Sequence, residues 1–479
     1  MTLIGQRRAA SPSAAATAPW FDSLAEAWQA MNDLRGTLPS PTRNVRSAAL
    51  TSAIEIVTDA LYLPGPSGQR RVPSAGAIFP YTTMVLANEE HGGLSTGWSL
   101  FQVSSDGRVS DVPVEKALTS GLAQALHPAA DEGVAHLLLL NRPWMSIRKY
   151  GPRGYLYSRL DAAHALVNLL GIALERGTAW LRLNCGGYEV ENLLSGHAPY
   201  HELAGVVSVR GEFTTSSTTV EAIKPHAPAI PAKPLARDLL EATCWSLLGE
   251  RVSPAASAGP AVGETLLHTG LPSEGQQNLR LAGRWSRASA MRRSARSFDG
   301  RPLDAEQIKA PLSALGTELP MNLQPGGASA MEVTVFVADP VDSDITLDRL
   351  LGRYGRVVTA RRTDRAAIAA ACMGQQQLRE AQAFVLVTAS RSRLLYHGRA
   401  EFEEALFRAG AGGQLMYLGA SRAGVGITTI GGFDPVRWAE LAGLPKDHEL
   451  LYLAALGNEA AVSVPKLDRD APAVAHGER

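Results

Sequence analysis

The spacing of apolar residues predicts strands and helices in two separate blocks of the chain. In the first block, residues 81–87 and 135–140 are apolar runs of strand length, and residues 160–175 repeat apolar positions at helical spacing. In the second block, a β-branched run ends just before Gly431, and the Asp-Pro pair at 434–435 predicts the start of a helix.

Proline- and alanine-rich stretches separate these blocks. The prolines of residues 224–234 exclude a regular helix and favour an extended connector. We therefore expect five parts: a disordered lead-in with a short helix at 1–40, a first folded half at 41–222, a Pro/Ala-rich linker with a helix at 223–285, a second folded half at 286–467, and a polar tail at 468–479.

Composition narrows the function classes. Lys plus Arg equals Asp plus Glu at 46 each, so no net field draws the protein to nucleic acid or to a membrane. The three cysteines are far apart, which argues against a zinc cluster or a disulfide framework, and we expect no metal site. The N-terminus lacks the apolar run of a signal peptide, so we expect a cytoplasmic protein.

The two blocks repeat an order of parts. The first contains residues 43–47, then 73–76, then a helix, then the Cys-Gly-Gly-Tyr of residues 185–188. The second contains residues 292–296, then 326–329, then a helix, then the Ile-Gly-Gly-Phe of residues 430–433. This repetition suggests a duplicated domain that packs as a pseudo-twofold dimer.

Three short segments could contact a flat, phosphorylated ligand. Arg292, Ser294 and Arg296 alternate, so in an extended segment they project to one side, where guanidinium groups and a hydroxyl suit a phosphate. Small residues after Pro73, and the glycine pair before residue 434, would let the main chain approach a planar ring. A solvated basic loop and ordinary turns would show the same patterns.

Lys149 and Tyr150 stand side by side ahead of the predicted helix. A tyrosine beside a cation can have a lowered pKa and act as a general base, although an adjacent Lys-Tyr pair is also common surface decoration. His164, inside the helix, is expected to be a core or surface histidine rather than a catalyst.

The order of these motifs resembles the nitroreductase superfamily and, more narrowly, the SagB-type dehydrogenases that oxidise azolines. The motifs are RRSARSF, PSAGAIFP, KYGPRGY and IGGFD, and the resemblance covers roughly residues 40–460. It implies an α+β fold of two fused nitroreductase-like halves that form a pseudo-twofold dimer and share FMN across their interface.

The resemblance also implies roles for individual residues. Lys149 and Tyr150 would be catalytic. The phosphate of FMN would be held by Arg292, Ser294 and Arg296, with Lys466 completing the site. Gln375 would lie near the pyrimidine edge, and Thr429, Gly431 and Gly432 would line the ring through the backbone. From the other half, the turn formed by Pro73, Ser74, Ala75 and Gly76 would reach across.

The implied reaction converts thiazoline or oxazoline rings to thiazole or oxazole in a peptide natural product pathway of antibiotic type. Tyr150, assisted by Lys149, would take a proton, FMN would accept the other hydrogen with two electrons, and dioxygen would be the final acceptor. Expected partners are a peptide or carrier-bound azoline and a cyclodehydratase or other pathway proteins.

One FMN per chain is expected, because the second pseudo-site lacks matching residues. Arg43 to Arg46 lack the phenylalanine that follows the RRSAR segment, residues 326–329 lack the proline, and Tyr396 has no adjacent lysine. Two other functions stay open: an NAD(P)H-dependent nitro or quinone reductase, and a scaffold subunit without flavin.

Overall fold

A computed structural model describes most of the two expected halves. The described residues are 42–91, 94–126, 133–150, 153–183, 185, 190, 193, 201–211, 217–222, 262–265, 284–323, 331–338, 356–359, 365–397 and 399–461. The helices predicted before residue 40 and after residue 234, the polar tail and Lys466 lie outside these residues.

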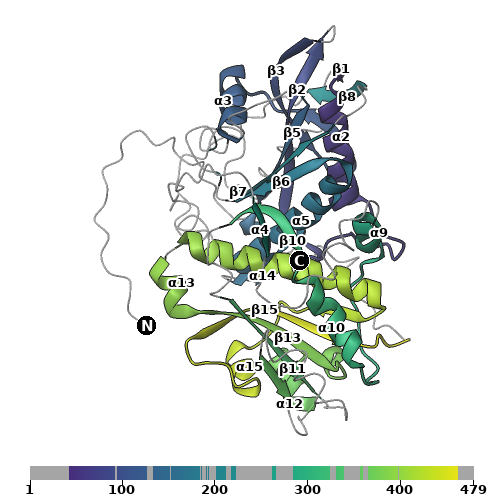
Figure 1. The fold of residues 1–479 in the computed structure, drawn as a ribbon, viewed down its shortest axis with the longest axis vertical. Helices are drawn as coiled ribbons and strands as arrows, with labels where there is room; N and C mark the ends of the chain where they lie inside the picture. The colour runs from purple at the N-terminus through teal and green to yellow at the C-terminus, as the bar shows by residue number, and fades with distance from the viewer. Residues whose placement is uncertain are drawn as a thin grey trace, which may run out of the picture.

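The first half is built on a sheet that contains ten described strands (Figure 1). In spatial order they are β1 (Thr42–Arg46), β8 (Ser217–Ala222), β4 (Val109–Asp111), β3 (Leu94–Val103), β2 (Tyr81–His91), β5 (Val134–Asn141), β7 (Glu202–Arg210), β6 (Thr178–Arg182), β10 (Glu318–Asn322) and β9 (Val262–Thr265). The strands predicted at 81–87 and 135–140 form β2 and β5, which lie at the centre of this sheet.

The second half has a sheet of five described strands. In spatial order they are β12 (Arg356–Thr359), β11 (Met331–Val337), β13 (Ala383–Ser390), β15 (His448–Gly457) and β14 (Gly426–Thr429). The β-branched run before Gly431 is β14, as the sequence predicted.

Four strands of each sheet share one arrangement. The orders β2-β5-β7-β6 and β11-β13-β15-β14 are both antiparallel throughout. In each half a long helix directly precedes the last of these strands: α5 (Arg153–Arg176) precedes β6 and α14 (Arg399–Ala423) precedes β14. The two halves differ at the next strand, since β3 pairs antiparallel with β2 whereas β12 pairs parallel with β11.

The shorter helices cover the sheets and connect the strands. They are α2 (Ala48–Val57), α3 (Lys116–Leu126), α4 (Pro143–Tyr150), α9 (Arg284–Met291), α10 (Ala305–Ala314), α12 (Arg365–Ala371), α13 (Arg391–His397) and α15 (Pro435–Leu441). The predicted helix start at 434–435 is confirmed, because the Asp434 side chain accepts hydrogen bonds from the backbone N–H groups of Val436 and Arg437.

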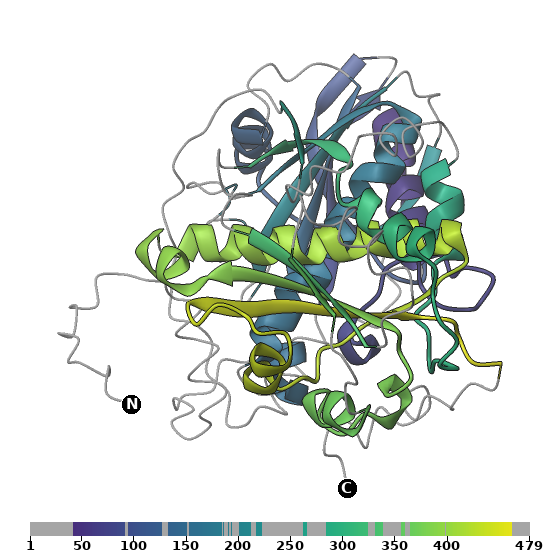
Figure 2. The same ribbon diagram turned by 60° about the horizontal axis from the view of Figure 1, so that its bottom comes forward.

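The helices α5 and α14 pack against each other where the halves meet. In Figures 1 and 2, α14 runs between the larger and the smaller sheet. A Cβ atom on Gly410 of α14 would lie 2.6 Å from the carbonyl oxygen of Leu160 on α5, so this glycine permits the close approach. One continuous apolar cluster contains buried residues of both helices, including Leu166 and Leu415.

Strands from later in the chain extend the first sheet. β10 pairs parallel with β6, and β9 pairs antiparallel with β10. β9 lies within the segment expected to be a linker, so part of that segment belongs to a sheet. No helix among the described residues is long and apolar enough to cross a membrane.

Candidate functional site

The Arg-Arg-Ser-Ala-Arg segment follows α9 and contacts the first half. Arg292 is buried, and its guanidinium donates to the carbonyl oxygen of Arg70 from Nη2 at 2.6 Å and from Nε at 3.2 Å. It also lies 5.0 Å from the ring centre of Tyr417, and burial lowers the pKa of Arg292. The backbone N–H of Ser294 donates to Gln69 at 3.0 Å. Arg292 therefore already has protein partners, and its role toward a phosphate stays a prediction.

Arg296 differs from Arg292 in this respect. Its side chain is half-buried, and it forms no hydrogen bond or ion pair with the residues that the structure describes. A guanidinium in this state remains available to an anion.

Tyr417 of α14 joins the arginine segment to the end of β14. Its hydroxyl lies 2.9 Å from Ser294 Oγ and accepts a hydrogen bond from the backbone N–H of Thr429 at 3.0 Å. The backbone N–H of Ala295 donates to the carbonyl oxygen of Ile427 at 2.8 Å. The structure thus brings the arginine segment next to Thr429 at the end of β14. The family resemblance had implied that both contact FMN.

The glycine turn after β14 is held by Gln375. Its Nε2 donates to the carbonyl oxygen of Gly432 at 2.7 Å and to that of Cys372 at 2.9 Å. A Cβ on Gly432 would lie 3.2 Å from this Nε2, and one on Gly431 would lie 3.5 Å from the ring of Tyr157. The glycines leave the backbone open where side chains would fill the space.

Tyr157 of α5 connects this turn to the first half. Its hydroxyl donates to the carbonyl oxygen of Gly431, and its ring meets that of Tyr150 edge to face at 5.1 Å. Nearby, Arg153 donates to the carbonyl oxygen of Phe433 at 2.7 Å. Burial raises the pKa of Tyr157, which keeps its hydroxyl a hydrogen-bond donor.

The Lys149–Tyr150 pair ends α4 and precedes α5. The sequence predicted that the pair lies ahead of the long helix α5, and it does. The pair also forms the last two residues of the short helix α4. A Cβ on Gly76 would lie 2.3 Å from Tyr150 Oη and 2.6 Å from Lys149 Nζ. Gly76 has φ of +60°, so both space and backbone conformation require glycine here.

A buried carboxylate of α5 holds the Pro-Ser turn. Asp161 accepts from Ser74 Oγ at 2.5 Å and from the backbone N–H of Ala75 at 3.1 Å. Burial raises the pKa of Asp161 to about 7, although these hydrogen bonds oppose the rise. Ala77 and Phe79 have φ of +57° and +51°, so this turn keeps two non-glycine residues in a strained conformation.

The contacts form a closed circuit through both halves. In the second half, Ser294 contacts Tyr417, which contacts Thr429, and the chain continues from there to Gly431. Gly431 contacts Tyr157 of the first half, whose ring meets Tyr150, and Tyr150 lies against Gly76. Residues 69–75 then lead back to Ser294 through Gln69. Of the predicted site residues, Arg296 has no described side-chain contact in this circuit, and Lys466 lies outside the described residues.

The circuit suits a planar ligand with an anionic end. Arg71 precedes the Pro-Ser turn, and its buried Nε has no hydrogen-bond partner. The positions of Gly431 and Gly432 form a cradle that Cβ atoms would narrow. An uncompensated cation and an open glycine backbone fit the phosphate and the ring of FMN.

Several residues of the circuit were not found by sequence analysis. Tyr157, Asp161 and Tyr417 lie within long helices, and their partners come from segments that are remote in the sequence. Arg71 could have been found from the sequence, because it stands beside Arg70 and only two residues before Pro73. His164 is a core residue, as expected: it is buried and lies 2.9 Å from the hydroxyl of Tyr452.

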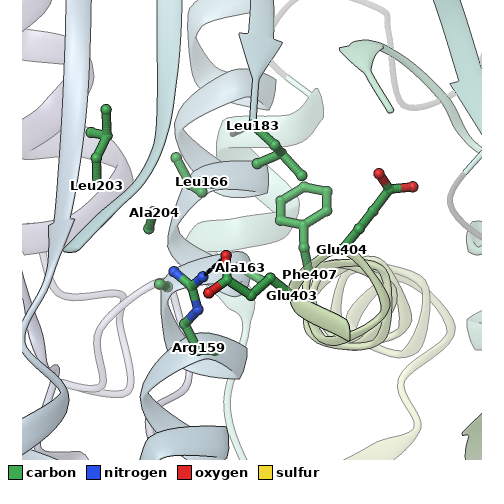
Figure 3. A pocket seen from close by; sticks show the side chains of 10 residues that line it. Arg159, Ala163, Leu166, Leu183, Leu203, Ala204, Glu403, Glu404 and Phe407 are labelled. Carbon is green, nitrogen blue, oxygen red and sulfur yellow. Dashed lines mark ion pairs between the residues drawn. The ribbon is translucent and has the colours of Figure 1, made fainter. Parts of the chain in front are cut away.

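The region that corresponds to this site by strand order lies beyond β6, and it contains a cluster of ion-paired side chains. A small cavity of about 30 Å³ there is lined mainly by alanine and leucine side chains and Phe407, and its charged lining residues are Arg159, Glu403 and Glu404 (Figure 3). Arg159 forms ion pairs with Glu403 and, at 3.5 Å, with Glu202. The hydroxyl of Tyr155 lies 3.2 and 3.3 Å from these two carboxylates.

The first-half counterpart of the arginine segment is also occupied. Residues 43–46 lie in the edge strand β1, and Arg43 pairs with Glu89 at 2.8 Å and Asp111 at 2.5 Å. Residues 326–329, the predicted counterpart of the Pro-Ser turn, and the side chain of Tyr396 lie outside what the structure describes.

Comparisons with known proteins identify the class of the second half. Residues 290–458 match the sequence profile of the Nitroreductase family. No curated protein matches the chain. The second half therefore carries a nitroreductase-family domain, and this range contains the arginine segment, Gln375 and the glycine turn.

Solved structures extend the comparison to the whole fold. A protein from Anabaena variabilis, provisionally named a nitroreductase, is 17% identical and covers 89% of this chain and 95% of its own, with a TM-score of 0.61. A nitroreductase from B. subtilis is 18% identical and covers 39% of this chain and 71% of its own, with a TM-score of only 0.27. The Anabaena match shows that this chain has a nitroreductase-like α+β fold.

Proposed function

We propose that the chain is an FMN-dependent oxidoreductase that dehydrogenates thiazoline or oxazoline rings to thiazole or oxazole in a peptide natural product pathway. The observation that carries the proposal is the circuit of contacts between the two halves. It joins the arginine segment and glycine turn of one half to the Pro-Ser turn and Lys-Tyr pair of the other. The nitroreductase-family domain at residues 290–458 supports the oxidoreductase class.

In this proposal both halves are nitroreductase-like copies and share one cofactor. Ser294 and Arg296 would hold the phosphate of FMN, and Gly431, Gly432 and Gln375 would border the ring. The shared strand order supports the duplication, and the charged side chains beyond β6 support one FMN per chain. When bound, FMN supplies the two-electron acceptor chemistry.

The residues of the first half would handle the proton. Tyr150 would take it from the azoline ring, and the neighbouring ammonium of Lys149 would stabilise the phenolate that accepts it. The position of Gly76 against both side-chain ends keeps the pair packed on the Pro-Ser turn. Asp161 and Tyr157 would fix the distance between this pair and the glycine turn.

The proposal includes its partners. The substrate would be an azoline within a peptide or on a carrier, delivered by a cyclodehydratase or another pathway protein in the cytoplasm. Dioxygen would receive the electrons.

Two measurements test the proposal. Flavin released from the purified full chain should amount to one FMN per chain, and an azoline peptide should lose the mass of two hydrogens. A stoichiometry near two would contradict the assignment of a single site. Colourless protein that gains no flavin on titration would favour the scaffold function instead.

A second candidate function is an NAD(P)H-dependent nitro or quinone reductase. The match of residues 290–458 to the Nitroreductase family favours it. Rapid bleaching of bound flavin by NADPH, without any azoline oxidation, would select the reductase over the azoline oxidase.

A further inference from the structure

Arg71 carries a largely buried positive charge that none of the described residues compensates. Arg71 is 9% exposed, and its Nε is inaccessible and has no hydrogen-bond partner, whereas its two terminal nitrogens remain accessible to a ligand. Within the described part of the chain, its guanidinium forms no hydrogen bond and no ion pair. Withdrawing most of a charged side chain from water without a partner carries a desolvation penalty, and an anion bound at the accessible nitrogens would offset it.

Other buried or nearly buried arginines of the same chain have compensation. Arg159 is paired with two glutamates, and Arg408 is paired with Glu404 at 2.8 Å. Arg292 donates to the carbonyl oxygen of Arg70 and lies on a tyrosine ring. Of the three arginines that are buried in the described part of the chain, Arg71, Arg292 and Arg408, only Arg71 has a guanidinium with neither a hydrogen bond nor an ion pair.

The backbone around Arg71 is fixed by the second half. The carbonyl oxygen of Arg70 accepts from Arg292, and that of Arg71 accepts from Gln414 Nε2 at 3.3 Å. Gln69, two residues earlier, accepts from the backbone N–H of Ser294. The Pro-Ser turn begins two residues later. Arg71 therefore stands between the arginine segment of one half and the Pro-Ser turn of the other.

We propose that Arg71 binds the phosphate of FMN, an inference that rests on the proposed function. A guanidinium matches the geometry of a phosphate with two parallel donors, and phosphate is the strongest anion that the cofactor offers. Arg292 has its donors directed at carbonyl oxygens, so it is the less suitable of the two buried arginines. The anion site then draws Arg71 from the first half and Ser294 with Arg296 from the second.

Arg70 provides a matched control. It is the adjacent residue of the same type, but its guanidinium lies 4.1 Å from the ring centre of Phe79 and 5.7 Å from that of Tyr62. These rings compensate its charge within the first half. Replacing Arg70 removes the same charge from the same segment without removing the group assigned to the phosphate.

The experiment compares FMN with riboflavin, which has the same ring and no phosphate. Full-length apoprotein, Arg71→Met and Arg70→Met are titrated with each flavin by fluorescence quenching. In Arg71→Met, FMN affinity should fall about tenfold to a hundredfold, as for a lost charge-assisted bond, while riboflavin affinity stays unchanged. Arg70→Met should bind both flavins as the unaltered chain does.

Thermal unfolding of the apoproteins supplies a second readout. Arg71→Met should unfold at the same or a higher temperature than the unaltered chain, because a buried uncompensated charge has been removed. A lower unfolding temperature would overturn the inference and assign Arg71 a structural role.

Other outcomes separate the two proposals. An equal loss of FMN and riboflavin affinity in Arg71→Met would overturn the phosphate assignment, and so would unchanged FMN affinity; both leave the proposed function standing. An unaltered chain that binds neither flavin would overturn the proposed function itself.

Discussion

Two regions flank the pair of long helices, and they differ in chemistry. On one side, Tyr157 of α5 meets the backbone of Gly431, and the contacts are made by hydroxyls, amides and glycines. On the other side, two residues further along α5, Arg159 meets Glu202 and Glu403. The pair α5 and α14 thus borders the glycine turn on one side. On the other side it borders the ion pairs of Arg159 with Glu202 and Glu403.

Under the proposed function, this difference explains why one of the two regions binds FMN and the other does not. A phosphate near Glu202 and Glu403 would face like charges in a region already poor in solvent. Near Arg71 and Arg296 it would meet cations without described partners.

Replacing the Lys-Tyr pair should have the largest effect. Tyr150→Phe and Lys149→Ala should each slow azoline oxidation by about 10²–10⁴-fold, the usual contribution of a general base, while FMN stays bound. Mass spectrometry follows the product, which is lighter by two hydrogens. Tyr155→Phe, on the opposite side of the helix pair, is the control and should oxidise azolines at the original rate. Full activity in both pair variants would refute the assignment and favour the reductase.

Breaking the ion-pair cluster should change stability but not cofactor content. Arg159→Met removes the cation that pairs with both glutamates, and we expect the free energy of unfolding to fall by about 3–5 kcal/mol. Denaturant unfolding measures this, and FMN per chain should be unchanged. The triple variant with Glu202→Gln and Glu403→Gln should recover much of the loss. A gain of a second FMN in either variant would show that charge alone closes the counterpart site.

The two arginine segments should respond differently to the same substitution. Arg296→Ala should weaken FMN binding by about tenfold to a hundredfold, as expected for a lost bond to phosphate. Arg43→Ala, in the first-half counterpart, should leave FMN binding unchanged because Arg43 is engaged with Glu89 and Asp111. Equilibrium dialysis measures both. Equal affinities in the two variants would mean that Arg296 does not contact the phosphate.

The smallest expected effect, taken per pH unit, is a pH dependence of stability at the Pro-Ser turn. The pKa of Asp161 is about 7 in the folded protein, against about 3.9 for an exposed aspartate, so the folded state holds the proton more tightly. The free energy of unfolding should therefore fall as pH rises from about 4 to about 7, by at most about 1.4 kcal/mol per pH unit.

Asp161→Asn tests this dependence, because asparagine does not ionise and the decline should disappear. His164, whose pKa burial lowers to about 3, has the opposite effect over part of this range, but it is present in both proteins. The difference between their stability curves therefore isolates Asp161. Parallel curves from pH 4 to 7 would contradict the raised pKa.

Local patterns predicted much of the fold. The strands β2, β5 and β14 and the capped start of α15 follow from side-chain periodicity and from Asp434, which act within a few residues. The order of parts also predicted the repetition that the two sheets display. These strands, the helix start and the repetition can be read from the sequence without knowing which remote residues are in contact.

The candidate site was only partly predictable, because its partners come from remote segments. The alternation of Arg292 and Ser294 suggested one shared phosphate role, yet Arg292 donates to the backbone of Arg70. The residues next to Arg292 in the sequence do not indicate that the carbonyl oxygen of Arg70 will be its partner. Tyr157 likewise contacts Gly431 only because α5 and α14 are packed together.

The strand β10 has a consequence for synthesis. It supplies the neighbour of β6, whose edge would otherwise expose unpaired N–H and C=O groups that attract other chains. About 140 residues separate Arg182 at the end of β6 from Asn322 at the end of β10. At about 5–20 residues per second, a ribosome needs roughly 7–28 s to cover that distance. For that time the nascent first half has an open sheet edge, and a cell that makes this protein must keep neighbouring nascent chains away from it.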